Sequence, residues 1–303
     1  MSAIQSLRTA TDALSRCPVL VVGGLLYGLV VLPQRALQLA GVPLAPALIQ
    51  VVTFFVTPFV VASVVGMARE ALDGETSLGS GTAVGKARYV DLLLATLLEL
   101  GIKLAFGVVF VILALLLLVG VGSAGPAALV GGGVLLLALL AYVAVLFLVQ
   151  FYPVVVVVED AGPVDAVTES VGFVRSNLVS TLGFSVVTVL LGGLASLPVA
   201  GVAAYQFATT DPGSAGDAPG PIGGGMTPGG GAANGSGGTP QLADALASGA
   251  GPGLGLSTPE VVALSLVSVA ATAAFVAFRL TYATAFYRRN GRSVEERVLD
   301  DEW

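Results

Sequence analysis

Long uninterrupted apolar runs alternate with short polar segments along this chain. Two of the runs, LAFGVVFVILALLLLVGVG and VGGGVLLLALLAYVAVLFLVQFY, contain no ionised side chain. About 18 such residues in a row are enough to cross a bilayer as a helix. Backbone groups in hydrocarbon must bond within their own segment, so even the valine-rich runs predict helices rather than strands. The pattern predicts an all-α, polytopic integral membrane protein, with residues 1–303 forming a single transmembrane domain.

The apolar pattern divides into six expected transmembrane helices. We place them at about residues 17–33, 43–68, 100–121, 127–152, 178–204 and 259–283. Near the end of the fourth, Pro153 predicts a kink, and the valines that follow it are expected to face lipid.

A short amphipathic helix is expected between spans four and five. Pro163 suits the first helical position, and the helix is expected to end at about Ser176. Its apolar side chains recur at three- and four-residue steps, at Val164, Val167, Val171 and Val174. Such a helix is expected to lie along the cytoplasmic membrane interface.

The distribution of Arg and Lys predicts the orientation, because cytoplasmic loops carry the excess of positive charge. One set of loops and ends holds Arg8, Arg16, Arg69, Lys86, Arg88, Arg175, Arg288, Arg289, Arg292 and Arg297, whereas the other set holds only Arg35. Both termini are therefore expected in the cytoplasm of a multi-pass cell-membrane protein. Residues 284–303 are expected to form a charged cytoplasmic tail.

Residues 206–258 differ sharply from the rest, because they are rich in Gly, Pro and Ser and contain no basic residue. This composition predicts a flexible extracytoplasmic loop. Within it, Asn234-Gly235-Ser236 matches the acceptor pattern for N-glycosylation, although chance is the commoner origin of this pattern in a low-complexity segment. Thr258 and Pro259 suit the start of the last span.

The charge composition limits the kinds of partner that the protein can bind. Only 11% of the 303 residues are charged, and acidic residues outnumber basic ones by 19 to 13. The lipid bilayer is the expected partner, with other membrane proteins as further candidates. Nucleic acid is excluded as a partner, since phosphate binding requires a basic surface. An acidic chain with two lysines also suggests a halophilic archaeon, where salt screens carboxylate repulsion.

The residue inventory excludes several kinds of chemistry. The chain has one cysteine, Cys17, and no histidine. A disulfide framework, a structural zinc site and histidine-based acid-base catalysis are therefore ruled out. The glycine-rich segments lack the lysine of a phosphate-binding loop. We expect no cofactor, no metal and no catalytic residue, and hence a protein that is not an enzyme.

Three charged residues lie in or near expected spans. Glu99 and Lys103 are spaced i to i+4 in the order that favours an ion pair on one helix face. Intramembrane charges often mark a transport path, but this pair fits better at the cytoplasmic interface, with the span proper beginning at Leu104. Arg279, beside Tyr282 and Tyr287, fits best as an interfacial anchor.

The segment after the fourth span resembles a known family. A valine-rich helix end and an acid are followed by a Gly-Pro turn, a small-xxx-small pair and a basic-x-Asn motif. Here these are Glu159, Gly162, Pro163, Ala166, Ser170, Arg175 and Asn177. The pattern is similar to the six-helix membrane domain found beside some bacterial glycerophosphodiester phosphodiesterases and to its uncharacterised archaeal relatives.

What the resemblance implies is an architecture and a place in the membrane. These 303 residues include no catalytic domain of that kind, so phosphodiesterase activity does not carry over. The small pair Ala166 and Ser170 permits close approach of a neighbouring helix, and Ser176 or Asn177 can cap the fifth span.

Three functions follow from these observations as expectations. The first is a non-catalytic membrane scaffold or modulator. The alternative is a transporter of a small or lipophilic molecule, with Glu99, Lys103 and Arg279 in a polar cavity. A weaker alternative is a membrane-embedded enzyme acting on lipid, which would require polar residues converging near a lipid-facing opening.

Overall fold

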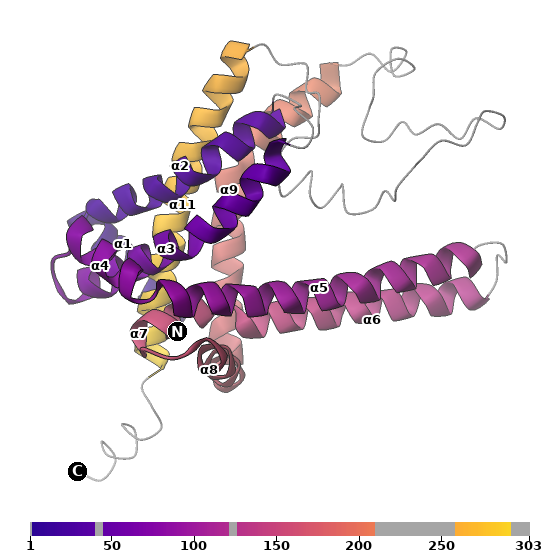
Figure 1. Ribbon diagram of the computed structural model, residues 1–303, viewed down its shortest axis with the longest axis horizontal. Helices are drawn as coiled ribbons and strands as arrows, with labels where there is room; N and C mark the ends of the chain where they lie inside the picture. Colours follow the sequence, from indigo (N-terminus) through magenta and orange to yellow (C-terminus); the bar gives the residue numbers. More distant parts are fainter. Residues whose placement is uncertain (1, 40–44, 121–125, 210–257, 292–303) are drawn as a thin grey trace, which may run out of the picture. The chain divides into compact units, whose positions relative to one another are not determined.

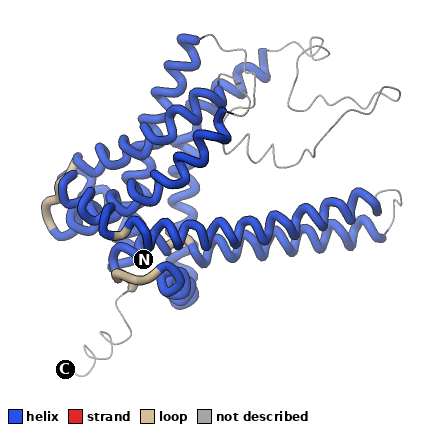
Figure 2. Tube along the Cα trace, in the orientation of Figure 1, coloured by secondary structure: helices blue, strands red, loops and turns tan. Residues whose placement is uncertain are grey.

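The computed structural model describes residues 2–39, 45–120, 126–209 and 258–291, and within these ranges every regular element is a helix (Figures 1 and 2). The helices are α1 (Ser2–Arg16), α2 (Val19–Leu39), α3 (Ala45–Asp73), α4 (Leu78–Ala87), α5 (Tyr89–Gly120), α6 (Pro126–Val149), α7 (Tyr152–Val158), α8 (Pro163–Ser176), α9 (Leu178–Thr209) and α11 (Thr258–Asn290). This confirms the all-α class for the described residues. The run of five valines lies in a helix, as expected.

Six helical stretches in the described ranges are long and apolar enough to span a membrane. They are Val19–Leu37, Leu48–Asp73, Tyr89–Leu117, Val130–Val158, Leu178–Leu197 and Val262–Asn290. Each overlaps one of the six expected spans. The third begins much earlier than residue 100, because α5 starts at Tyr89 and continues without a break past Glu99 and Lys103.

The helices fall into two compact units. The first contains Met1–Leu20, Pro58–Val186 and Phe278–Trp303, and the second contains Val21–Thr57 and Val187–Ala277. The first unit therefore holds α1, α4, α5, α6, α7 and α8 with parts of α3, α9 and α11. The second holds most of α2 and the remaining parts of the other long helices.

The valines of α7 lie in the core of the first unit. Val154, Val155, Val156 and Val157 are at most 2% exposed. The expectation that they face lipid is wrong. The helix breaks between Val149 and Tyr152, and Pro153, which cannot donate a backbone hydrogen bond, takes the second position of the new helix α7. The kink is thus a full interruption, after which the valines pack among other helices.

An aromatic cluster packs beside α7 in the same unit. The ring of Phe151 contacts those of Phe173, Phe184 and Phe286 at centroid distances of 5.0 to 5.7 Å. Tyr282 contacts Phe184 at 4.6 Å, and its hydroxyl donates to the carbonyl of Ala3 at 3.1 Å. Phe151 and Phe286 are fully buried. This cluster joins α7, α8, α9 and α11 and connects α11 to the amino-terminal helix α1.

The last helix is longer than expected. α11 continues to Asn290, and its residues 282–287 are buried. Residues 284–290 therefore belong to the helix rather than to a charged tail, because Phe286 and Tyr287 add their rings to the aromatic cluster. Residues 292–303 lie outside the described ranges.

The long Gly/Pro-rich segment is bracketed by the last residues of α9 and the first of α11. α9 ends at Thr209 and α11 begins at Thr258, where the sequence predicted a helix start. Residues 210–257, including Asn234, lie outside the described ranges.

The helices α1 and α4 were not expected from the sequence. α4 is capped by Ser77, whose hydroxyl accepts a hydrogen bond from the backbone N–H of Ser80. Its Gly81 and Gly85 lie against α3, where a side chain on Gly81 would collide with Met67. α4 is short and its buried residues are glycines, so its apolar pattern is too weak to distinguish it from a loop.

In the second unit α2 approaches α11 closely. A Cβ atom on Gly24 would overlap the carbonyl oxygen of Ala273, and one on Gly28 would lie 2.9 Å from Cγ1 of Val269. Two glycines four residues apart expose the backbone of one helix face, which allows this approach. The pair therefore sets the packing of α2 on α11.

Candidate functional site

The turn between α7 and α8 combines special backbone geometry with charge. Asp160 has a φ of 56°, in the left-handed region that few residues other than glycine adopt. Gly162 precedes α8, and its carbonyl accepts a 2.8 Å hydrogen bond from Ala166 N–H. Pro163 is the first residue of α8, as the sequence predicted.

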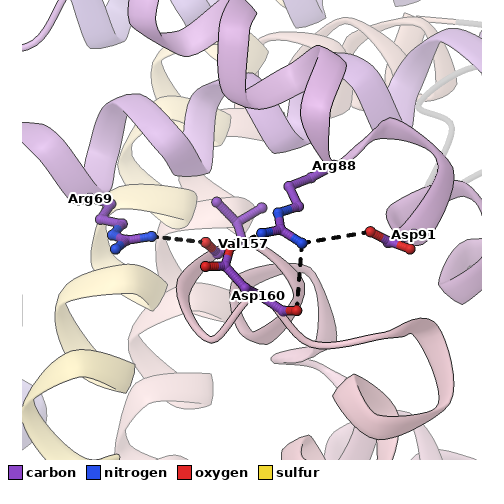
Figure 3. Close-up of polar contacts among 5 residues, drawn as sticks. All are labelled: Arg69, Arg88, Asp91, Val157 and Asp160. Atoms are coloured by element: carbon purple, nitrogen blue, oxygen red, sulfur yellow. Dashed lines mark hydrogen bonds and ion pairs between the residues drawn. The ribbon is translucent and has the colours of Figure 1, made fainter.

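Two arginines from other helices hold this turn (Figure 3). The guanidinium of Arg88, at the junction of α4 and α5, forms an ion pair with Asp160 and lies 3.8 Å from Asp91. Arg69 of α3 donates to the carbonyl of Val157 at 3.2 Å. The turn is therefore bound to α3 and to the start of α5 by two cationic side chains.

A third arginine extends the network to α11. Nη1 of Arg288 lies 2.9 Å from the Asp73 carboxylate and donates to the carbonyl of Arg69 at 3.2 Å. The contact with the carbonyl of Arg69 joins the last residues of α11 to the last turns of α3. Arginines thus join the ends of α3, α7 and α11.

The inner face of α8 consists of small residues and one aromatic ring. Ala166 and Ser170 are fully buried, and Phe173 and Val174 complete the buried face. Val164 is 61% exposed whereas Val174 is fully buried, so the expected valine stripe packs inward only at its carboxyl-terminal end. The small residues decide the packing because they let α8 lie close to α5, α6 and α7.

Ser170 joins α8 to the break before α7. Its hydroxyl donates to the carbonyl of Leu148 at 2.9 Å and accepts from the N–H of Phe151 at 3.2 Å. Both backbone groups lie where the interruption of the helix removes their regular partners. The serine of the small pair is therefore a specific polar contact as well as a small residue.

The other motif residues near α8 have different positions. Arg175 is exposed, whereas the side-chain amide of Asn177 donates to the carbonyl of Phe173 at 3.2 Å. The backbone carbonyl of Asn177 accepts from Thr181 N–H at 2.9 Å. Asn177 thus closes α8 with its side chain and begins α9 with its backbone.

Glu159, at the end of α7, and Glu169, on α8, lie near one another in the first unit. Burial raises the pKa of the Glu169 carboxyl, and the nearby carboxylates of Glu159 and Asp165 raise it further. The backbone N–H of Glu159 donates to the carbonyl of Val155 at 2.9 Å and ends α7, while its carboxylate faces Tyr287.

Glu99 and Lys103 form the ion pair that their spacing predicts. Nζ of Lys103 lies 2.7 Å from Oε1 of Glu99, and the hydroxyl of Tyr152 donates to Oε2 of Glu99 at 2.9 Å. Thr96 lies 3.3 Å from the same hydroxyl. The side chain of Glu99 is 23% exposed and that of Lys103 is 44% exposed. The carboxylate is therefore bound on both oxygens.

Arg279 is not part of this pair. Its side chain is exposed on α11, and its charge lies within electrostatic range of Tyr152. Glu99 thus binds Tyr152 directly and Lys103 pairs with Glu99, whereas only the charge of Arg279 reaches Tyr152.

A comparison with protein families identifies the chain. A family described as "Domain of unknown function (DUF7847)" matches residues 1–290. The chain belongs to this family. The matched range ends at the last residue of α11, so the domain includes every helix described above, α1 and α4 among them. No curated protein and no solved structure matches the chain.

Within the DUF7847 domain, the described residues do not gather three or more His, Cys, Asp or Glu side chains in a geometry that could hold a metal ion. The charged groups instead pair with arginine, lysine, tyrosine or backbone carbonyls. The pairings of Arg69, Arg88 and Arg288 connect the ends of helices, so these three cations have a structural role.

Sequence reasoning missed Tyr152 and Asp160 as members of these sites. Tyr152 lies in an apolar run, and nothing in its spacing links it to Glu99, because the break at residue 150 turns α7 back toward α5. Arg88 and Asp91 offered a local signal, the i to i+3 spacing of opposite charges at a helix start. The partner Asp160 is distant in sequence and has no local signal.

Proposed function

We propose that this DUF7847 domain is a six-span integral membrane protein of the cell membrane that acts as a non-catalytic scaffold or modulator. Both termini lie in the cytoplasm, and α8 lies along the inner interface. One observation supports this function above all, the exposed apolar side chains of the α5–α6 hairpin.

The α5–α6 hairpin supports a scaffold because it offers a large apolar surface. The two helices lie side by side along their length in the first unit (Figure 1). None of the described side chains in residues 101–117 or 130–148 is buried, although Phe106, Phe110 and Tyr142 contact one another between the helices. A pair of helices this exposed suits contact with lipid and with other membrane proteins.

The positions of the cations support the orientation. In the first unit Arg8, Arg16, Lys86, Arg175 and Arg289 are exposed on α1, on α4, on α8 and at the end of α11. A single cation, Arg35, lies near the far end of the first membrane-capable helix. Such an asymmetry is typical of a protein whose basic ends remain in the cytoplasm.

Transport is the second candidate, and the bonds between Glu99, Lys103 and Tyr152 are the observation that favours it. Their depth argues against it. Residues 104–120 of α5 extend about 25 Å at 1.5 Å per residue, a little less than the ~30 Å hydrocarbon thickness. The pair therefore lies near the inner boundary, where lysine can reach headgroup water.

Measurements of proton flux distinguish a scaffold from a transporter that uses Glu99 and Lys103 as a proton path. The wild-type protein and the Glu99→Gln/Lys103→Gln variant are reconstituted in vesicles, and proton entry is followed with an internal pH dye under an imposed potential. A scaffold leaves the vesicles as tight as protein-free ones. Proton entry that requires the wild-type protein and disappears in the double variant would instead establish transport.

Photo-crosslinking in intact cells tests the scaffold directly. A photoreactive residue is placed at Leu116 or Leu137, which are 64% and 67% exposed on the hairpin, and in a control at Leu190 of α9, which is 64% exposed. We expect discrete protein adducts from both hairpin positions and lipid adducts alone from the control. Lipid adducts alone from all three positions would contradict a scaffold.

The origin of the domain is part of the same proposal. The turn after the fourth span supports a relationship to the membrane domains of glycerophosphodiester phosphodiesterases and to archaeal proteins, and the excess of acidic residues supports a halophilic source. Stability that rises steadily between about 0.1 M and 3 M KCl would agree with a halophilic source, since salt screens like charges. Unchanged stability would oppose it.

A further inference from the structure

Arg35 lies in the second unit, next to the closest contact between α2 and α11. Gly24 and Gly28 bring the two helices together, and Arg35 follows two turns later on α2. Its Nη1 donates to the hydroxyl of Ser268 on α11 at 2.6 Å. Because side chains of a helix point back toward its amino terminus, Arg35 reaches α11 close to the glycine contact.

Among the described side chains of its unit, none forms an ion pair with Arg35. The guanidinium is partly buried and stays protonated at all accessible pH values. Ion pairs among the described residues involve Arg88, Lys103 and Arg288, whereas Arg35 binds a neutral hydroxyl. A partly buried cation favours an anion beside it.

A second polar group on α11 has an unused hydrogen-bonding capacity. The hydroxyl of Ser265 is buried, with the residue only 3% exposed, and it has no hydrogen-bond partner. Residues three apart on a helix share a face, so Ser265 lies one turn from Ser268 on the same side. Buried hydroxyls ordinarily have a partner. Ser265 therefore adds a second hydroxyl to the face of α11 that carries Ser268, the residue that binds Arg35.

The chemistry of these donors fits a phosphate. A guanidinium presents several N–H donors in a plane, a geometry that matches the oxygens of a phosphate group. Both serine hydroxyls can donate as well. The oxygen of Ser268 accepts from Arg35, which leaves the proton of Ser268 available, and the hydroxyl of Ser265 has no partner.

The position along α2 indicates the source of the phosphate. Residues 19–35 extend about 25 Å along the helix, close to the ~30 Å thickness of the hydrocarbon layer. In the proposed topology Arg35 thus lies at the depth of the outer-leaflet headgroups. We propose that Arg35, Ser268 and Ser265 bind the phosphodiester of an anionic lipid in the outer leaflet. Only the choice of leaflet rests on the proposed topology.

Binding in detergent tests the site without depending on the scaffold role. Delipidated full-length protein is titrated with dioctanoyl phosphatidylglycerol, and bound lipid is counted by native mass spectrometry. The wild-type protein should bind one lipid that Arg35→Gln weakens about tenfold or more, because a hydrogen bond to a charged group is lost. Ser265→Ala and Ser268→Ala should each weaken it several-fold.

The matched control is Arg175→Gln, which removes an exposed arginine on α8 and should leave affinity unchanged. Equal losses in the Arg35 and Arg175 variants would overturn the site, since net charge alone would then explain binding. Inorganic phosphate that binds in place of the lipid would show a site for free phosphate and overturn the lipid assignment.

The four carboxylates in the sequence of the second unit, those of Asp211, Asp217, Asp244 and Glu260, provide the remaining control. Replacing the three aspartates with Asn and Glu260 with Gln should leave lipid affinity and melting temperature unchanged. If this fourfold variant instead lowers the melting temperature, and the wild-type protein binds no lipid, the chain supplies its own anion and the proposal fails.

Discussion

The hydroxyl of Ser170 on α8 donates to the carbonyl of Leu148 at the end of α6. The same oxygen accepts from Phe151, so one buried serine satisfies two backbone groups on either side of the helix break. The interruption of the fourth span, which leaves these groups without helical partners, and the small residue on α8 are therefore parts of one feature.

Replacing Ser170 tests this feature. Ser170→Ala preserves the close packing but leaves the Phe151 N–H without an acceptor in a buried position. We expect a loss of about 1 to 3 kcal/mol in the free energy of unfolding, measured by denaturation in detergent. Ser176→Ala, which removes an exposed hydroxyl bonded within α8, should cost less than about 0.5 kcal/mol. Equal costs for the two variants would contradict this role.

Two substitutions at Asp160 separate the contribution of backbone strain from that of the ion pair. Asn tolerates a φ of 56° nearly as well as Asp, so Asp160→Asn should lose only the ion pair with Arg88, about 0.2 to 1 kcal/mol for a partly exposed pair. Asp160→Val also places a β-branched residue in the left-handed region, which should add about 1 to 2 kcal/mol. Comparable unfolding curves for both variants would refute the assigned backbone role.

Glu169 predicts a pH dependence. Burial and then the neighbouring carboxylates raise its pKa above the ordinary 4.5, so the folded state holds the proton more tightly than the unfolded state. This contribution is fully present below the unfolded pKa and is lost as pH rises through the raised folded pKa. Glu169→Gln should therefore raise the melting temperature at pH 7 and have no effect near pH 3.5. A melting temperature of Glu169→Gln below that of the wild-type protein at pH 7 would disprove the predicted pH dependence.

The contact between α2 and α11 predicts different tolerances for two glycines. Gly24→Ala introduces a methyl group where the carbonyl of Ala273 already lies, which should cost about 1 to 3 kcal/mol. Gly132→Ala on α6 meets no atom within 4 Å and should be neutral or stabilising by up to about 1 kcal/mol. Unfolding in detergent measures both, and a harmless Gly24→Ala would show that the helices are not packed this closely.

The sequence predicts the helices well where the signal is local. Unbroken apolar runs locate the six membrane-capable helices, and Gly162-Pro163 locates the start of α8. The i to i+4 spacing of Glu99 and Lys103 correctly predicts their ion pair. Each of these signals depends on residues within a few turns of one another.

The remaining features depend on contacts between segments distant in sequence. Val154 looks equally suited to lipid and to a protein core, since both environments are apolar, and only the break before α7 makes it a core residue. Tyr152 is likewise joined to Glu99 by the path of the chain rather than by spacing. In α8 the buried face combines the small residues Ala166 and Ser170 with Phe173 and Val174, so only one of the four valines of the expected stripe is buried.

Cysteine accessibility in intact cells tests the six-span topology most directly. In a Cys17→Ser background, single cysteines replace Ala232, in the segment between α9 and α11, and Ser293, after α11. A membrane-impermeant maleimide should label position 232 in intact cells and position 293 only after lysis. Labelling of position 293 in intact cells, or protection of position 232 until lysis, would contradict cytoplasmic termini joined by six spans.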